Sequence, residues 1–286
     1  ADLEVHPNEG LRSPAYPSAF ALRTVRNPEP PLTAVDDHGH DVRPLIATRD
    51  RRYVDDFRLS SIQGYADEHT LEIDTGAAEK DGRVLLLLTG WTDYAFSSDN
   101  VAAHQAGLAF RPPELQARNA SGRWETVVPE LGLPVGRPQT VAVDLTPHTR
   151  RGLRVFRIVT TLRVYWDEIL VDRSEPAATL VSRMNPKDAR LKWRGFSAEI
   201  APDGRAPAEY DYDRVTTAAP WKLLPGRYTR EGDVTPLLNA RDDQFVIAAR
   251  GDEIALSFDS TVLPPLPAGW RHTFLLYADG FSKEMN

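Results

Sequence analysis

Apolar and polar residues are arranged so that most of the chain is predicted to form β-strands. Residues 71–74 alternate between apolar and acidic side chains and are followed by Gly76. Residues 84–88, in contrast, are a continuous apolar run. Alternation predicts a strand with one buried face, and a short continuous run predicts a strand buried on both faces. Further strands are expected at residues 115–118, 124–128, 141–145 and 162–166, with a turn at 119–123 that makes the first two a hairpin. Strands at this spacing, without amphipathic helices between them, are typical of a β-sandwich.

A second β-rich segment is expected after residues 173–176, a polar link that ends in Pro176. Its predicted strands are residues 245–248, 253–258 and 273–277, which are rich in apolar and β-branched side chains. Residues 193–228 show no regular period, although many aromatic rings lie there among prolines and glycines. Such a segment is ordered only if its rings anchor it onto a sheet.

The N-terminal residues are rich in proline, which removes backbone hydrogen-bond donors and interrupts helices. We therefore expect an extended arm that packs along a neighbouring surface, with one short connector helix where Val42, Leu45 and Ile46 lie at helical spacing. The predicted fold is all-β in three parts. These are a proline-rich arm over residues 1–54, a jelly-roll sandwich over 55–173 and a second β module over 174–286.

Composition and charge exclude several classes of protein. The 286 residues include 41 Asp and Glu against 34 Lys and Arg, a formal net charge of −7, which argues against nucleic-acid binding. No apolar run approaches the roughly 20 residues of a membrane helix, so we expect no transmembrane segment. Cysteine is absent, which excludes disulfides, thiol nucleophiles and zinc-thiolate sites. The first residues lack a basic stretch followed by an apolar segment, so no signal peptide is expected within this chain.

The sequence holds no recognisable catalytic motif, neither a G-x-S-x-G elbow, an H-E-x-x-H helix nor a glycine-rich nucleotide loop. Adjacent carboxylates occur at Asp36 and Asp37, Asp55 and Asp56, Asp167 and Glu168, and Asp242 and Asp243. Neighbouring residues on a strand point to opposite faces, so a hydrolase would need carboxylates from different strands. That alternative stays open. We expect a protein without enzymatic activity and without a cofactor.

His38 and His40 are the one close histidine pair in the sequence. Alternate residues on an extended chain point to the same side, which would allow a metal clip. Gly39 together with Asp36 and Asp37 also suits an exposed turn, and we prefer that interpretation. A calcium site that used an acidic pair would lack the usual D-x-D-x-D-G loop. No metal site is predicted.

Residues 91–100 are expected to form a loop at the rim of the sheet. They combine the rings of Trp91 and Tyr94 with the short polar side chains of Asp93 and Asn100. Sugar sites need that combination, because the C–H face of a pyranose packs on a ring while carboxylates and amides bind its hydroxyl groups. The alternative is that Trp91 and Phe96 close the end of the sandwich.

A second aromatic position lies at residues 165–167. Trp166 shares its predicted inward face with Leu162 and Val164, so it is expected in the core, whereas Tyr165 faces outward. Tyr165 therefore joins the candidate ligand-binding residues.

Several of these stretches together resemble a galactose-binding-like jelly roll: residues 71–76, the apolar strand, residues 91–94 and residues 165–172. From about residue 34 onward, the chain is similar to the C-terminal region of large bacterial exported proteins. Those proteins combine FG-GAP repeats with an ASPIC/UnbV segment, as in the cartilage acidic protein-like group, or carry tetratricopeptide repeats. Residues 87–94 and 273–283 match best.

The resemblance implies a non-catalytic module of the periplasm or cell surface, next to other domains or subunits. It supplies no catalytic or ligand residues. The pattern of these proteins continues beyond Asn286, so we expect a fragment of a longer protein.

Two functional hypotheses follow. The first is a binding module with carbohydrate as the expected small ligand, bound by Trp91, Asp93, Tyr94, Asn100 and Tyr165. The second is a structural subunit of a larger surface or membrane-associated assembly, because the proline-rich arm gains order only along another surface. The subunit hypothesis predicts burial, within the chain or in an assembly, of residues 28–31 and of at least two rings among Tyr210, Tyr212, Trp221 and Tyr228.

Overall fold

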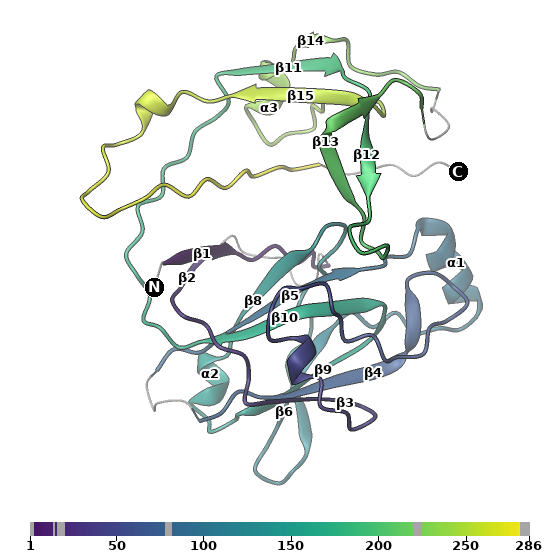
Figure 1. Cartoon of the computed structure of the whole chain (residues 1–286), viewed down its shortest axis with the longest axis vertical. Coiled ribbons are helices and arrows are strands. Elements are labelled where there is room, and N and C mark those ends of the chain that lie inside the picture. The colour runs from purple at the N-terminus through teal and green to yellow at the C-terminus, as the bar shows by residue number, and fades with distance from the viewer. Residues whose placement is uncertain (1–2, 14, 16–20, 78–81, 220–224, 281–286) are drawn as a thin grey trace. The chain divides into compact units, whose positions relative to one another are not determined.

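The computed structural model describes residues 3–13, 15, 21–77, 82–219 and 225–280. Strands account for 37% of the structure and helices for 9%, so the protein is all-β, as predicted (Figure 1). The chain divides into two compact units, Ala1–Ala178 and Thr179–Asn286. Each unit has a hydrophobic core of its own.

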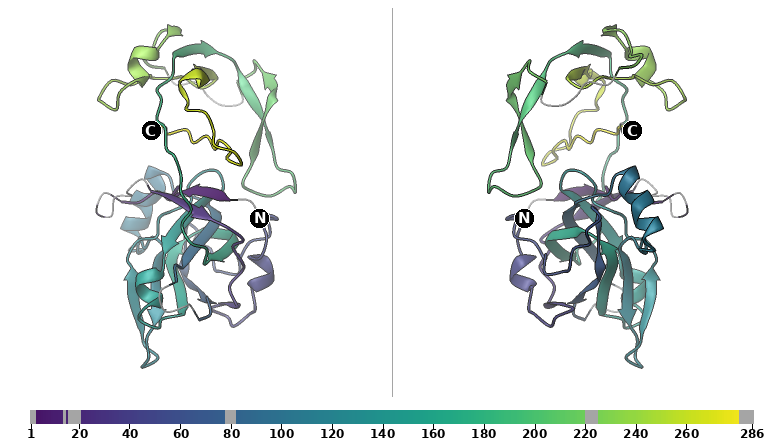
Figure 2. Two further views of the ribbon diagram at one scale, coloured as in Figure 1. Left: turned by 90° about the vertical axis from the view of Figure 1, so that its left-hand side faces the viewer. Right: turned by 90° about the vertical axis from the view of Figure 1, so that its right-hand side faces the viewer.

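The first unit is built from two main antiparallel sheets (Figures 1 and 2). The five-stranded sheet has the order β3 (Thr33–Asp36), β4 (Tyr65–Asp74), β9 (Val155–Leu162), β6 (Glu114–Arg118) and β7 (Trp124–Val128). The three-stranded sheet has the order β10 (Val164–Asp172), β5 (Leu85–Thr92) and β8 (Gln139–Asp144). The predicted hairpin is present as β6 and β7.

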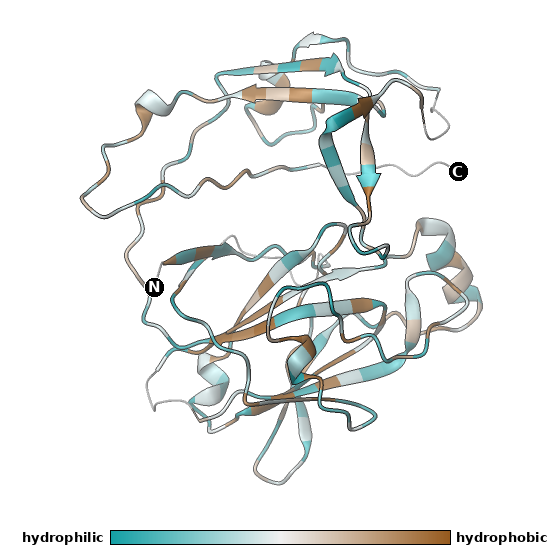
Figure 3. Cartoon of the chain, in the orientation of Figure 1, coloured by the Kyte–Doolittle hydropathy of each residue, from teal (hydrophilic) through white to brown (hydrophobic). Residues whose placement is uncertain are grey.

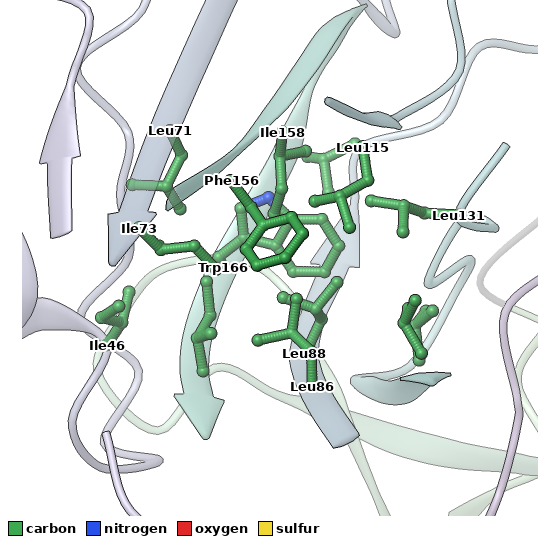
Figure 4. Close-up of a cluster of buried hydrophobic side chains, with 14 of the residues drawn as sticks. Ile46, Leu71, Ile73, Leu86, Leu88, Leu115, Leu131, Phe156, Ile158 and Trp166 are labelled. Atoms are coloured by element: carbon green, nitrogen blue, oxygen red, sulfur yellow. The ribbon is translucent and has the colours of Figure 1, made fainter. Parts of the chain in front are cut away.

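One core joins the two sheets, which makes the unit a sandwich. Phe156 and Ile158 of β9 and Leu86 and Leu88 of β5 belong to the same buried cluster (Figure 4). Apolar residues are concentrated on these strands (Figure 3). Every residue of β5 is buried, which confirms the strand predicted to be covered on both faces. Because successive side chains alternate, Leu85 and Leu87 face away from this core and form a second cluster with Val25 and Ala142.

Residues of the predicted N-terminal arm take part in the sheets. β1 (Glu4–Pro7) pairs with β2 (Leu22–Val25), and β3 pairs with β4. Where a short connector helix was expected, the chain makes one 3-10 turn, η1 (Arg43–Leu45), followed by the fully buried Ile46. Of the prolines at 28–31, Pro31 is buried and the other two are partly exposed.

Of the predicted rim loop at residues 91–100, only residues 93–96 lack regular structure. β5 continues through Trp91 to Thr92, and α1 (Ser97–Gln105) begins five residues later, so Asn100 lies on a helix. The Asp99 carboxylate accepts a hydrogen bond from the Phe96 N–H at 2.9 Å, which satisfies one donor at the helix start. A second short helix is α2 (Thr146–Thr149). Among the described residues, no helix is long and apolar enough to cross a membrane.

The second unit has a small core. β11 (Asp188–Trp193) lies between β14 (Gly232–Asp233) and β15 (Asp252–Ser257), while β12 (Phe196–Ile200) pairs with β13 (Glu209–Thr216). Two short turns, α3 (Thr235–Leu238) and η2 (Ser260–Val262), complete the unit. Ala189, Leu191 and Val234 are its buried hydrophobic cluster.

Three predictions for this unit were wrong and one is confirmed. β15 matches the strand predicted at residues 253–258, but residues 245–248 and 273–277 are not strands. Residues 193–228, predicted to be irregular, contain β12 and β13. An apolar pattern becomes a strand only within a β-ladder. Among the described residues neither 245–248 nor 273–277 belongs to a ladder, although Ile247 exchanges hydrogen bonds with Thr229. The rings of Tyr210, Tyr212 and Tyr228 are exposed, and Trp221 lies outside the described residues.

Candidate functional site

The outer face of the three-stranded sheet, which points away from the main core, carries apolar, polar and aromatic side chains. On β5 this face is formed by Leu87, Thr89 and Trp91, because Leu86 and Leu88 point into the core. An apolar residue, a hydroxyl and an aromatic ring therefore follow one another along one strand.

A β-bulge in β10 brings two further side chains to the same face. The pairing with β5 skips Asp167, so that Tyr165 is opposite Trp91 and Glu168 is opposite Thr89. The Asp167 carboxylate is buried and accepts the backbone N–H groups of Asp50 and Arg51 at 3.1 and 2.9 Å. Burial raises the pKa of Asp167, while these two hydrogen bonds oppose the rise. The bulge thus fixes the segment that carries Arg49 beside the sheet.

A cavity of about 230 Å³ opens on this outer face. It is smaller than the roughly 300–1,000 Å³ of pockets for drug-sized ligands, so it suits one small ring. Glu4 and His6 of β1 lie on its wall together with Pro28 and Arg49, which lie outside the strands, and residues of β5, β8 and β10 form the remainder. The complete lining is Glu4, His6, Pro28, Arg49, Leu87, Thr89, Thr140, Glu168 and Leu170.

A cation and a carboxylate face the cavity together. Arg49 Nη2 donates to the hydroxyls of Thr89 and Thr140 at 3.3 and 3.4 Å, and these two hydroxyls lie 2.9 Å apart. Burial raises the pKa of Glu168, and the charge and backbone N–H of Arg49 oppose that rise. Glu4 adds a smaller increase through charge repulsion. The cavity therefore offers hydrogen-bond donors and acceptors over an apolar floor of Leu87 and Leu170.

Trp91 and Tyr165 lie on the same face as the cavity but are packed against each other. Their rings are stacked with centroids 4.7 Å apart and an interplanar angle of 12°, and Tyr53 meets each of them edge-on at 6.1 Å. Trp91 is only 9% exposed, so its ring is not open for stacking with a sugar. Burial raises the pKa of the half-buried Tyr165 phenol. Trp166 is in the core, as predicted.

Asp93, Tyr94 and Asn100 lie beyond the end of β5 and form a separate group. Asp93 accepts a hydrogen bond from Arg163 Nη1 at 2.9 Å, and Asn100 Oδ1 accepts one from the Tyr65 hydroxyl at 2.8 Å. Asp93 thus joins the segment after β5 to Arg163, and Asn100 joins α1 to β4. The Tyr94 ring is 44% exposed and packs edge-on against Phe96. The five predicted ligand residues are therefore divided between this rim and the Trp91–Tyr165 stack.

Sequence reasoning missed most of the cavity. Glu168 was noted only as one of an adjacent acidic pair, and Arg49, Glu4 and His6 were not singled out. These residues come from distant parts of the chain, and no local motif connects them. The alternation of Leu87, Thr89 and Trp91 was the one available signal, because it marks a polar position on the outer face of a buried strand.

Among the described residues, one group of side chains has the composition and spacing to hold a metal ion: Asp36, His38, His40 and Asp56. Asp36, His38 and His40 belong to the turn at the end of β3, Asp56 comes from a later segment, and none of the four lines the cavity.

Comparison with known proteins gives no assignment. No protein-family model matches the chain, and no curated protein and no solved structure is significantly similar to it. The function proposed for the chain therefore rests on its own geometry.

Proposed function

We propose that the protein is a non-catalytic carbohydrate-binding module and that the sugar binds in the outer-face cavity. One observation carries the proposal: a cation, a carboxylate and two hydroxyls converge over an apolar floor. A pyranose presents hydroxyl groups that both donate and accept, together with an apolar C–H face. Its recognition therefore needs both kinds of surface in one small cavity.

The roles follow from the chemistry of each side chain. The Arg49 guanidinium donates to a sugar hydroxyl and cannot accept, whereas the Glu168 carboxylate accepts from a neighbouring hydroxyl. Leu87 and Leu170 contact the C–H face. The resemblance to exported bacterial proteins supports an extracytoplasmic location and a galactose-binding-like jelly roll as parts of the same proposal.

Glu4 and Glu168 both line the cavity, and a glycosidase also needs two carboxylates. Burial raises the pKa of Glu168, as in a general acid, but Glu4, which would have to act as the nucleophile or base, is 59% exposed and contacts His6 at 3.2 Å. We therefore propose binding without cleavage. A sugar incubated with the protein is expected to be recovered intact, and release of a reducing end would establish the hydrolase instead.

The test is a glycan array followed by calorimetric titration of the best sugar. Arg49→Ala and Glu168→Gln are each expected to weaken binding by about 10- to 100-fold, the scale of a hydrogen bond to a charged group. Tyr94→Ala is the matched control, because its ring lies at the rim, and should bind like the parent. Two results would contradict the proposal. The first is that no sugar binds with a Kd below about 1 mM, and the second is that Arg49→Ala binds the sugar as well as the parent does.

A second candidate function, a subunit of a larger assembly, is favoured by the surface of the second unit. Of the 26 exposed large hydrophobic residues among the described positions, 18 belong to this unit. Phe274, Leu276 and Tyr277 are 66–70% exposed and have no strand partner. Exposed apolar surface of this extent is typical of protein–protein interfaces.

Native mass spectrometry of the protein isolated from its natural source distinguishes the two candidates. A subunit is expected to be recovered in a stable complex without sugar affinity. A lone chain that binds a sugar would reject the subunit function.

A further inference from the structure

The turn that follows β3 brings two histidine rings to one side. The Gly39 N–H donates to the Asp36 carbonyl at 3.1 Å, and the Asp36 N–H donates to the His40 carbonyl at 3.2 Å. Gly39 has a φ of +84°, a conformation that favours glycine. The His38 and His40 rings are stacked with centroids 5.9 Å apart. The predicted exposed turn is therefore present, and it also places both rings together.

Asp36 is held by the same turn with one oxygen directed at the histidines. Its Oδ1 accepts the backbone N–H groups of His38 and His40 at 3.0 and 2.8 Å. Its Oδ2 lies 3.1 Å from His40 Nδ1, and only 4% of the side chain is exposed. Burial opposes ionisation of this carboxyl, but its hydrogen bonds and His40 lower its pKa overall. Backbone donors orient metal-binding carboxylates in this way.

Asp56 completes the group from a segment remote from the turn. Its Oδ2 lies 3.3 Å from His40 Nδ1 and 3.8 Å from His38 Nδ1. All four ligand atoms lie within 4.8 Å of one another. Ligands bound to zinc at about 2.0–2.2 Å in tetrahedral geometry are separated by about 3.3–3.5 Å. The distances from the Nδ1 atoms of His38 and His40 to the carboxylate oxygens of Asp36 and Asp56 range from 3.1 to 3.8 Å, on both sides of that separation.

We propose that Asp36, His38, His40 and Asp56 bind one Zn²⁺ ion. Two imidazoles and two carboxylates form a mixed nitrogen and oxygen set that suits zinc, whereas Ca²⁺ needs six to eight oxygens and Mg²⁺ an octahedron of oxygens. The two carboxylates balance the charge of the ion. The His38, His40 and Asp56 side chains are 52–64% exposed, so the ion can enter from solvent.

Zinc at this position is a structural clip. It joins the turn after β3 to the segment at Asp56, and the neighbouring Val54 makes a β-bridge to Trp166 of β10. Both sheets of the sandwich are thereby connected through one ion. Zinc should raise the thermal unfolding temperature of the full chain, and a chelator should reverse the increase.

The experiment is a calorimetric zinc titration of the full chain without an affinity tag. One ion per chain is expected. His40→Ala and Asp56→Asn should each weaken zinc binding by at least about tenfold. Removing a residue that only orients a metal ligand already lowers metal affinity by about that factor, and these two residues are proposed to bind the ion directly. His104→Ala is the matched control, because it removes an exposed histidine of α1, and its affinity should equal that of the parent.

Histidine-selective NMR provides an independent measurement, because the chain has 7 histidines and no cysteine. The imidazole signals of His38 and His40 should shift at one equivalent of zinc, while the other histidines stay unchanged. Equal zinc affinity of the parent and the His38→Ala/His40→Ala double variant would overturn the site and indicate adventitious binding only. A parent protein that does not bind zinc would also overturn the site. The cluster would then be a set of ion pairs, which includes the 3.3 Å contact between His38 and Asp37.

Discussion

Phe156→Ala is expected to destabilise the first unit by about 3–5 kcal/mol, the range for large aromatic truncations in a packed core. Phe156 is fully buried on β9 and lies in the cluster that joins both sheets (Figure 4). Truncation leaves a cavity whose walls belong to different strands, so the surroundings cannot easily close it. Such a loss is a large part of the about 5–15 kcal/mol that stabilises a typical folded protein.

Hydrogen exchange measured on peptides from β5 and β9 is the appropriate readout, because it reports on the first unit within the full chain. Phe96→Ala removes the same side chain from a position that is 42% exposed and should cost less than about 1 kcal/mol. Similar losses in the two variants would show that the two sheets do not share a packed core.

Arg163→Ala is expected to cost about 3 kcal/mol or more, because a largely buried cation loses several partners at once. The guanidinium donates to the carbonyls of Tyr65, Ser60 and Ile62 at 2.7–3.2 Å and to the Asp93 carboxylate at 2.9 Å. Its side chain is 13% exposed. Removal leaves three carbonyls and one carboxylate without this donor. Arg163→Lys should lose most of the same stability, since one ammonium group cannot reproduce the fork of the guanidinium.

Arg58→Ala is the control for Arg163. Arg58 pairs with Asp67 but is 82% exposed, and such surface pairs contribute about 0–1 kcal/mol. Denaturant unfolding of the three variants against the parent gives the comparison. If Arg163→Ala were as stable as Arg58→Ala, the rim would not depend on this guanidinium.

The sequence predicted those parts of the fold that depend on local pattern. The continuous apolar run at 84–88, the hairpin of β6 and β7 and the inward position of Trp166 all follow from whether neighbouring residues alternate. Trp91 was misplaced because the polar residues after it suggested a loop. In the structure β5 extends to Thr92, and its twofold periodicity turns Trp91 onto the outer face beside Tyr165.

The cavity could not be predicted, because it depends on residues far apart in the sequence. Of the proposed zinc site, the sequence indicated only that His38 and His40 would allow a metal clip, and Asp56 comes from a separate segment. Arg49 reaches Thr89 and Thr140 only because Asp167 in a β-bulge holds the backbone beside it. Asp56 meets His40 only after the turn and the later segment are folded together. Strands at 245–248 and 273–277 were predicted from apolar content alone, which does not reveal whether a pairing strand exists.

The most direct test of the carbohydrate proposal is methyl NMR of the full chain during titration with the best sugar from the array. Leu87 and Leu170 line the cavity, and Thr89 and Thr140 hold Arg49 above it, so their methyl signals should shift together and saturate. The Arg49→Ala variant should need at least about ten times more sugar for the same shifts. Shifts confined to residues near Tyr94 and Asn100, or to the second unit, with none at these four methyl positions, would contradict the proposed site.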